Sequence, residues 1–228
     1  MALTEETRVK AREIIARYPQ PRSALLPMLH LVQSEEGYVT PAGVTLCAEE
    51  LGLTKAEVGA VVTFYTMYKR RPTGDYLVSV CTNTLCGILG GDEIFEALSE
   101  HLGIGHNETV PDGNITLEHA ECLAACDYAP VVTVNYEFFD NQTPDSAREL
   151  VDSLADGGNG SLPKPTRGAS LCTFREIERL LAGFGDPRSE AVGEGPAGEP
   201  TLIGLRLAAD RGQQAPPYPE PTNSGKVR

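Results

Sequence analysis

The sequence predicts an α+β protein in three parts: an N-terminal helical bundle over residues 1–72, an α/β sandwich domain with a mixed sheet over residues 73–157, and an extended C-terminal tail over residues 158–228. Three observations predict this order. Helix caps precede apolar positions at helical spacing in the first part. Strand-like runs alternate with amphipathic runs in the second. The third is rich in proline and glycine, so it buries too little apolar area to offset the entropy of ordering.

Four helices are expected in the first part. Thr4 is a candidate cap for the first, and Thr40, followed by proline, is a typical start for the third. The second has apolar residues at helical spacing and should stop at Gly37. Thr54 and Glu57 form a capping box for the fourth. The expected helices cover residues 4–18, 23–36, 41–51 and 55–68.

The second part alternates between strands and helices. DYLVSVC and NITLEHAEC read as strands, and PVVTVNYEFF reads as a strand with a hairpin. GDEIFEALSEHLG is an amphipathic helix, and TPDSARELVDSLADG is a helix capped by Thr143. The order β-α-β-β-α is typical of helices packed on a small mixed sheet.

Two pairs of cysteines follow two of these strands. Cys81 and Cys86 form a C-x4-C pair, and Cys122 and Cys126 form a C-x3-C pair. If both loops leave the same edge of one sheet, the pairs can meet. Four thiolates suit either a binuclear iron-sulfur cluster or a tetrahedral zinc ion. Zinc knuckles usually use C-x2-C turns, so the longer spacing favours iron-sulfur, with a zinc-stapled interaction module as the alternative.

Composition favours metal ligation over disulfides. Six cysteines among 228 residues are too few for a disulfide scaffold. The chain opens without a secretory signal, and no stretch approaches the roughly 20 apolar residues needed to cross a bilayer. We therefore expect a soluble cytosolic protein without direct membrane insertion, in which paired cysteines are usually metal ligands or catalytic thiols.

The remaining candidate residues have ordinary explanations. Cys47 lies in an amphipathic helix and is expected to be a small buried hydrophobe, while Cys172 is expected to be a free thiol. His119 precedes Cys122 by three positions, but four thiolates already complete a ligand set. His30 is expected to be an ordinary helix residue.

Acidic residues concentrate around the cysteines. Residues 73–156 contain 16 Asp and Glu but one basic residue, Arg148. A nucleic-acid partner is disfavoured, because an acidic surface repels phosphates. Negative charge beside a cluster also opposes the addition of an electron, so it would lower the reduction potential.

Several strings carry a resemblance to a known family. VTFYTMY, SVCTNTLC, ECLAACDYAPVVTVN and YEFFDNQTP resemble the thioredoxin-like 2Fe-2S protein that forms the E subunit of NADH-quinone oxidoreductase, respiratory complex I, over about residues 5–157. The resemblance implies a thioredoxin-like domain whose 2Fe-2S cluster is held by the two cysteine pairs. The family commonly has glycine where this chain has Ala124, so a left-handed backbone angle is not expected there. Thioredoxin-like folds often have a cis-proline at the position of Pro130, and the sequence leaves its isomer open.

The resemblance also implies a function in a larger assembly. The chain would be an electron-transfer subunit of an NADH dehydrogenase, bound to the subunit that carries flavin and the NADH site and to other iron-sulfur subunits of the peripheral arm. That complex lies on the cytoplasmic side of the plasma membrane. The absence of a nucleotide-binding fingerprint fits this division of labour. The diaphorase small subunit of a soluble NAD-reducing hydrogenase or formate dehydrogenase would have the same ligands and stays an alternative.

A short amphipathic helix interrupts the tail near residues 171–184. Its apolar residues recur at near-helical spacing, and nothing else in the tail offers them a surface. Such a segment is typical of a docking element that folds on a partner, and the flavin subunit is the expected one. The alternatives are a helix that folds back on this chain and a segment that stays disordered.

Overall fold

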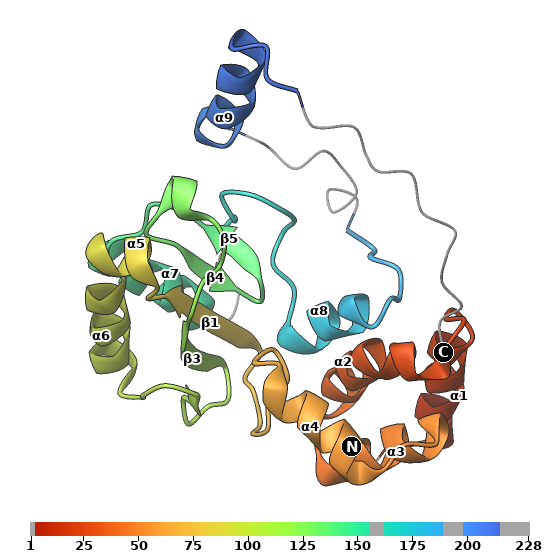
Figure 1. Ribbon diagram of the computed structural model, residues 1–228. Coiled ribbons are helices and arrows are strands. Elements are labelled where there is room, and N and C mark those ends of the chain that lie inside the picture. Colours follow the sequence, from red (N-terminus) through yellow and green to blue (C-terminus); the bar gives the residue numbers. More distant parts are fainter. Residues whose placement is uncertain (1–2, 156–161, 189–197, 215–228) are drawn as a thin grey trace. The chain divides into compact units, whose positions relative to one another are not determined.

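The computed structural model describes residues 3–155, 162–188 and 198–214 (Figure 1). The chain forms two compact units, Met1–Gly195 and Pro196–Arg228. The helices predicted for the first part and the sheet predicted for the second both lie within the first unit. The domain boundaries near residues 72 and 157 stay a prediction.

In residues 3–72, three of the four predicted helix starts are confirmed, whereas the second helix begins at Leu25, after a 3-10 turn, and not at Ser23. Thr4 caps α1, and Thr54 with Glu57 forms a capping box on α4. Thr40 accepts a bond from a backbone N–H at the start of α3. α2 stops at Gly37, whose φ of 79° is the left-handed angle that glycine adopts without strain. The bounds are α1 Glu5–Ile15, a 3-10 turn Pro21–Ala24, α2 Leu25–Glu36, α3 Pro41–Leu51 and α4 Lys55–Phe64.

Helix α4 ends before its predicted end because tertiary contacts draw the chain towards α2. Tyr65 is already extended, with φ −93° and ψ 117°. The Tyr68 hydroxyl donates to the Leu26 carbonyl at 3.0 Å, and the Lys69 N–H donates to Gln33 Oε1 at 2.6 Å. These bonds are long-range in sequence, so local propensity could not reveal them.

Among the described residues, five strands form one mixed sheet in the order β2-β3-β1-β4-β5. β1 runs parallel to β3, and the other neighbours are antiparallel. β4 and β5 form the predicted hairpin. The bounds are β1 Tyr76–Cys81, β2 Glu108–Thr109, β3 Ile115–Ala120, β4 Val132–Val134 and β5 Glu137–Phe139. The predicted α/β sandwich with a mixed sheet is confirmed. The short strand β2 was not predicted, because two residues are too few to show the alternation of a strand.

Two helices cover one face of this sheet (Figure 1). They are α6, Gly91–Leu102, and α7, Pro144–Ala155. Val78, Val80 and Leu117 point to this face and are buried with Leu98 and Val151. Because residues alternate between faces along a strand, the residues between them lie on the opposite face.

Helix α8, Phe174–Leu181, packs beside α2 on that opposite side (Figure 1). Its Phe174 and Ile177 form a buried cluster with Leu77 of β1. The stripe therefore packs on other parts of its own chain, which is the alternative to docking on a partner. Phe174 and Ile177 are buried in this contact, while Leu181 is 45% exposed.

A buried carboxylate fixes α8 in place. Glu178 is 0% exposed, and its side chain accepts hydrogen bonds from Gln33 Nε2 at 2.8 Å and from the Tyr136 hydroxyl at 2.9 Å. Its second contact with α2 is to His30 Nδ1, at 2.6 Å. Burial, followed by the charge of Glu178, raises the pKa of Tyr136 well above its usual value. The hydroxyl therefore stays protonated and donates a hydrogen bond to Glu178. His30 is thus part of a buried polar network, which its position in the sequence did not indicate.

Among its described residues, the second unit has one helix, α9, Glu199–Asp210. Three of its apolar residues, Ile203, Leu205 and Leu207, are exposed. This helix was not predicted, because it lies inside a Pro/Gly-rich segment. Within the described part of the chain, no helix combines the length and apolar character needed to span a bilayer.

Candidate metal centre

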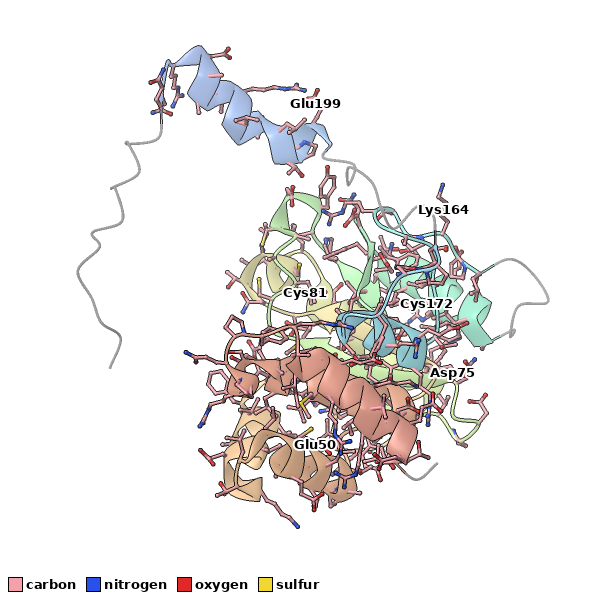
Figure 2. All side chains as sticks on the ribbon, turned by 90° about the vertical axis from the view of Figure 1, so that its right-hand side faces the viewer. Glu50, Asp75, Cys81, Lys164, Cys172 and Glu199 are labelled. Carbon is pink, nitrogen blue, oxygen red and sulfur yellow. The ribbon has the colours of Figure 1, made fainter. Side chains whose placement is uncertain are left out.

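The two cysteine loops start side by side at one end of the sheet. Cys81 is the last residue of β1, and its register partner in the parallel pair is Ala120, the last residue of β3. The N–H of Thr82 donates to the Ala120 carbonyl at 3.1 Å, which joins the loops where they begin. Figure 2 shows Cys81 at the end of β1 opposite Asp75, which precedes the strand. The prediction that both loops leave the same edge is confirmed.

The first pair is drawn together by a single helical turn. α5, Thr84–Ile88, returns the chain towards β1, and both Cys81 and Cys86 are buried. Burial, then the hydrogen-bonding neighbour Cys81, raises the pKa of the Cys86 thiol to about 11. The charge of Cys126 contributes a smaller part of this rise in pKa, so the second loop lies within electrostatic reach of the first. A metal cation would reverse this effect, because it displaces the thiol proton on binding.

Gly91 lets α6 begin directly against this pair. A Cβ atom at Gly91 would lie 2.4 Å from the Cys81 carbonyl oxygen and 2.9 Å from that of Cys86. Any side chain at this position would therefore force the backbone of α6 or of these two cysteines to move. This glycine was not predicted to matter, although the Gly-Gly step at the start of an amphipathic helix is the signal that could have indicated it.

The second pair lies on a more open loop. Cys122 and Cys126 are exposed, and the N–H of Ala124 points at Cys122 Sγ from 3.4 Å. Ala124 has a φ of 54°, in the left-handed region. The expectation that alanine would avoid this angle is wrong, because the turn must reverse for the N–H to face the sulfur. That geometry overrides a steric cost of about 1–2 kcal/mol.

The loop then returns to the sheet beside Cys81. Cys126 begins a short 3-10 turn, Cys126–Tyr128, and the Ala129–Pro130 peptide bond is cis. The Cys81 N–H donates to the Val131 carbonyl at 3.1 Å. Cys81 Sγ also lies 3.8 Å from the Glu121 carbonyl, directly before the second pair. Both loops are therefore in contact around Cys81.

The donors in these loops fit an iron-sulfur cluster. They are four thiols from two touching loops, one pair buried and one pair open to solvent. In the described ranges, no three or more His, Cys, Asp or Glu side chains already surround one point at metal-binding distances. His119 does not turn to the cysteines. Its ring packs on that of His106, with centroids 4.1 Å apart.

The other cysteines lie outside this centre. Cys47 is buried in α3, as predicted, and burial raises its pKa to about 12. Cys172 is a half-buried free thiol just before α8. Neither lies at the end of β1 or β3.

Comparison with known proteins gives the family. Over residues 11–155 the chain matches the thioredoxin-like 2Fe-2S ferredoxin family. The chain belongs to this family. The resemblance seen in the sequence strings is thus confirmed, and so is the expected cofactor type, since these ferredoxins carry a 2Fe-2S cluster.

Several relatives of this ferredoxin are subunits of respiratory enzymes. The E subunit of NADH-quinone oxidoreductase from Mycobacterium tuberculosis is 64% identical over 212 residues, covering 92% of this chain and 82% of the relative. NADH-quinone oxidoreductase subunit 2 of Thermus thermophilus is 41% identical over 127 residues, covering 55% of this chain and 70% of the relative.

A solved structure shares the ferredoxin fold at low identity. A chain in the crystal structure of an air-oxidised NAD+-reducing NiFe-hydrogenase aligns with a TM-score of 0.52 and 16% identity. The alignment covers 59% of this chain and 23% of that chain. At this identity the likeness concerns the fold alone.

Proposed function

We propose that this chain is the electron-transfer subunit of an NADH-quinone oxidoreductase, in which Cys81, Cys86, Cys122 and Cys126 hold one 2Fe-2S cluster. One observation carries the proposal: the two cysteine pairs follow the carboxyl ends of neighbouring parallel strands in a member of a 2Fe-2S family. Identity of 64% to the mycobacterial E subunit over 92% of the chain supports the respiratory enzyme as the parent complex.

The chain would hold the cluster and set its environment rather than make or break bonds. When bound, a 2Fe-2S cluster takes up and passes on one electron at a time. The thiolates supply negative charge to the irons, and the Ala124 N–H directed at Cys122 Sγ offsets part of that charge. The acidic excess of residues 73–156 acts in the opposite direction and disfavours the reduced form.

The partner that we propose is the flavin- and NADH-binding subunit of the same complex, docked at α5. Leu85, Ile88 and Leu89 are exposed in the turn around Cys86, at 40%, 77% and 52%. An apolar surface beside a redox centre is typical of an interface. Docking here would place the flavin near the cysteines, on the cytoplasmic side of the plasma membrane. Other iron-sulfur subunits of the peripheral arm would then accept the electrons.

The alternatives have less support. A diaphorase small subunit would use the same ligands, but the likeness to a hydrogenase chain at 16% identity concerns the fold and gives that function no separate support. A zinc-stapled module does not fit the family, whose description names a 2Fe-2S cluster.

Substitution of single cysteines tests the ligand set. Anaerobically prepared protein should contain about two irons and two sulfides per chain and give an EPR signal only after reduction. Cys81→Ser, Cys86→Ser, Cys122→Ser and Cys126→Ser should each lose or strongly change that signal. Cys47→Ala and Cys172→Ser are matched controls and should keep it. Stoichiometric zinc without visible absorbance would contradict the cofactor, and an unchanged spectrum after Cys122→Ser would contradict the ligand set.

A further inference from the structure

A buried ion pair lies behind the candidate ligands, between the helical segment and the sheet. Lys69 Nζ is 2.5 Å from Glu118 Oε2, with side-chain exposures of 9% and 14%. The hydroxyl of Ser79 donates to the other oxygen of Glu118 at 2.7 Å. Lys69 also donates to the Thr66 carbonyl at 3.1 Å. The pair is therefore held in one geometry by bonds to two strands and to the segment that follows α4.

This ion pair lies on the same sheet face as Cys81. Ser79 and Glu118 are register partners on β1 and β3, two residues before the partners Cys81 and Ala120. Residues two apart on a strand share a face, and they lie about 7 Å apart along it. Leu77, two residues earlier, contacts α8 on this face. Along β1 this face thus presents an apolar contact, then the ion pair, then the candidate ligand.

The surroundings screen these charges poorly. Thr133, the register partner of Ser79 on β4, is 2% exposed, and its hydroxyl is without a hydrogen-bond partner among the described residues. Ser79 is also only 4% exposed, so bulk water has little access to this face around β1 and β4. In such an environment a charge acts over a longer range than it would in bulk water.

The cation comes from outside the acidic segment. The single basic residue of residues 73–156, Arg148, lies on α7 and pairs with Asp145 in an exposed ion pair. α7 covers the other face of the sheet. Lys69 precedes this segment in sequence and reaches Glu118 from the helical part. The fold thus brings a positive charge to a place where the surrounding sequence has almost none.

We infer that Lys69 and Glu118 set the reduction potential of the cluster bound at Cys81, an inference that rests on the proposed ligand set. Reduction adds an electron, so the ammonium of Lys69 favours the reduced state and the carboxylate of Glu118 disfavours it. Lys69 thereby offsets part of the acidic excess around the centre. The two residues act through their charges and do not ligate iron.

A redox titration followed by EPR tests the inference on the cluster-loaded protein. Lys69→Met keeps the length of the side chain but removes its charge, so the midpoint potential should shift negative. Glu118→Gln should shift it positive. The double variant should lie between the single variants, and Lys69→Arg should restore the wild-type value. Lys10→Met is the matched control: Lys10 on α1 forms ion pairs with Glu6 and Glu35, so its replacement should leave the potential unchanged.

The outcomes separate this inference from the proposed function. Shifts of opposite sign in the midpoint potential of Lys69→Met and Glu118→Gln support the role of the two charges. A loss of packing alone would not shift the potential in opposite directions in the two variants. Shifts of the same sign, or shifts no larger than that of Lys10→Met, overturn the inference while the wild-type spectrum still supports the cluster. If Lys69→Met fails to retain a cluster, the sign of the Glu118→Gln shift decides. A wild-type protein without the 2Fe-2S signal overturns the inference and the proposed function together.

Discussion

Single residues shape the cysteine loops in ways that the spacing of the cysteines does not reveal. Gly91 allows α6 to start against the carbonyl groups of Cys81 and Cys86. Ala124 adopts a left-handed angle so that its N–H faces Cys122 Sγ. In both cases the backbone around a cysteine, rather than the cysteine itself, limits which residues can be accommodated.

The strain at Ala124 gives a stability prediction. Glycine adopts a positive φ without the Cβ clash, which is worth about 1–2 kcal/mol, but it makes the unfolded chain more flexible by about 0.4–1 kcal/mol. Ala124→Gly should therefore stabilise the protein by about 0.5–1 kcal/mol and keep the EPR signal. Anaerobic denaturant titration measures the change.

The neighbouring alanine provides the control. Ala125 has a φ of −122° and is 4% exposed, so it has no strain to relieve and a buried methyl group to lose. Ala125→Gly should destabilise the protein by about 1 kcal/mol. If Ala124→Gly destabilises the protein as much as Ala125→Gly does, the left-handed angle stores no strain.

At the scale of elements, α8 connects the parts of the first unit. Its apolar residues contact β1, and Glu178 bonds to α2 and to the β4–β5 turn. The family match ends at residue 155, so α8 lies outside it. Although it lies outside the matched segment, α8 holds the helical part and the sheet together.

Removal of the Glu178 carboxylate should loosen this connection. In Glu178→Leu, Tyr136 and Gln33 would lose their buried acceptor, so we expect a loss of about 3–5 kcal/mol in the free energy of unfolding. Glu13→Leu, at an exposed position on α1, should change it by less than about 0.5 kcal/mol. Equal losses in the two variants, measured by denaturant titration, would show that the network does not hold α8.

At the scale of the whole molecule, the sequence predicted what depends on local pattern. The caps at Thr4, Thr40 and Thr54, the stop at Gly37 and the strand before Cys81 follow from residues near in sequence, and the structure has them. The packing of α8 did not follow, because Glu178 meets α2 across about 145 residues of intervening chain. A segment that looks unpartnered in sequence can find its surface in another part of the fold.

Charge is also arranged on the scale of the whole chain. The net charge is −13, and residues 73–156 alone contain 16 acidic residues against one basic residue. An acidic surface around an apolar centre at α5 would steer a partner with a basic rim towards the cysteines. Affinity would then come from the apolar contact, and association rate from the charges.

In binding to the proposed flavin subunit, the effect of the apolar contact on dissociation can be separated from the effect of the charges on association. Ile88→Glu places a charge in the centre of the apolar surface, so it should weaken binding at least about tenfold, chiefly through faster dissociation. Val9→Glu, at a 47% exposed position on α1, should bind as the wild type does.

For both the wild type and Val9→Glu, raising the salt concentration should slow association and change dissociation little, because screening acts on steering charges. Surface plasmon resonance with the purified flavin subunit measures both rates. Wild-type affinity in Ile88→Glu would show that the partner docks elsewhere, and an association rate that is independent of salt would show that the acidic excess serves solubility alone.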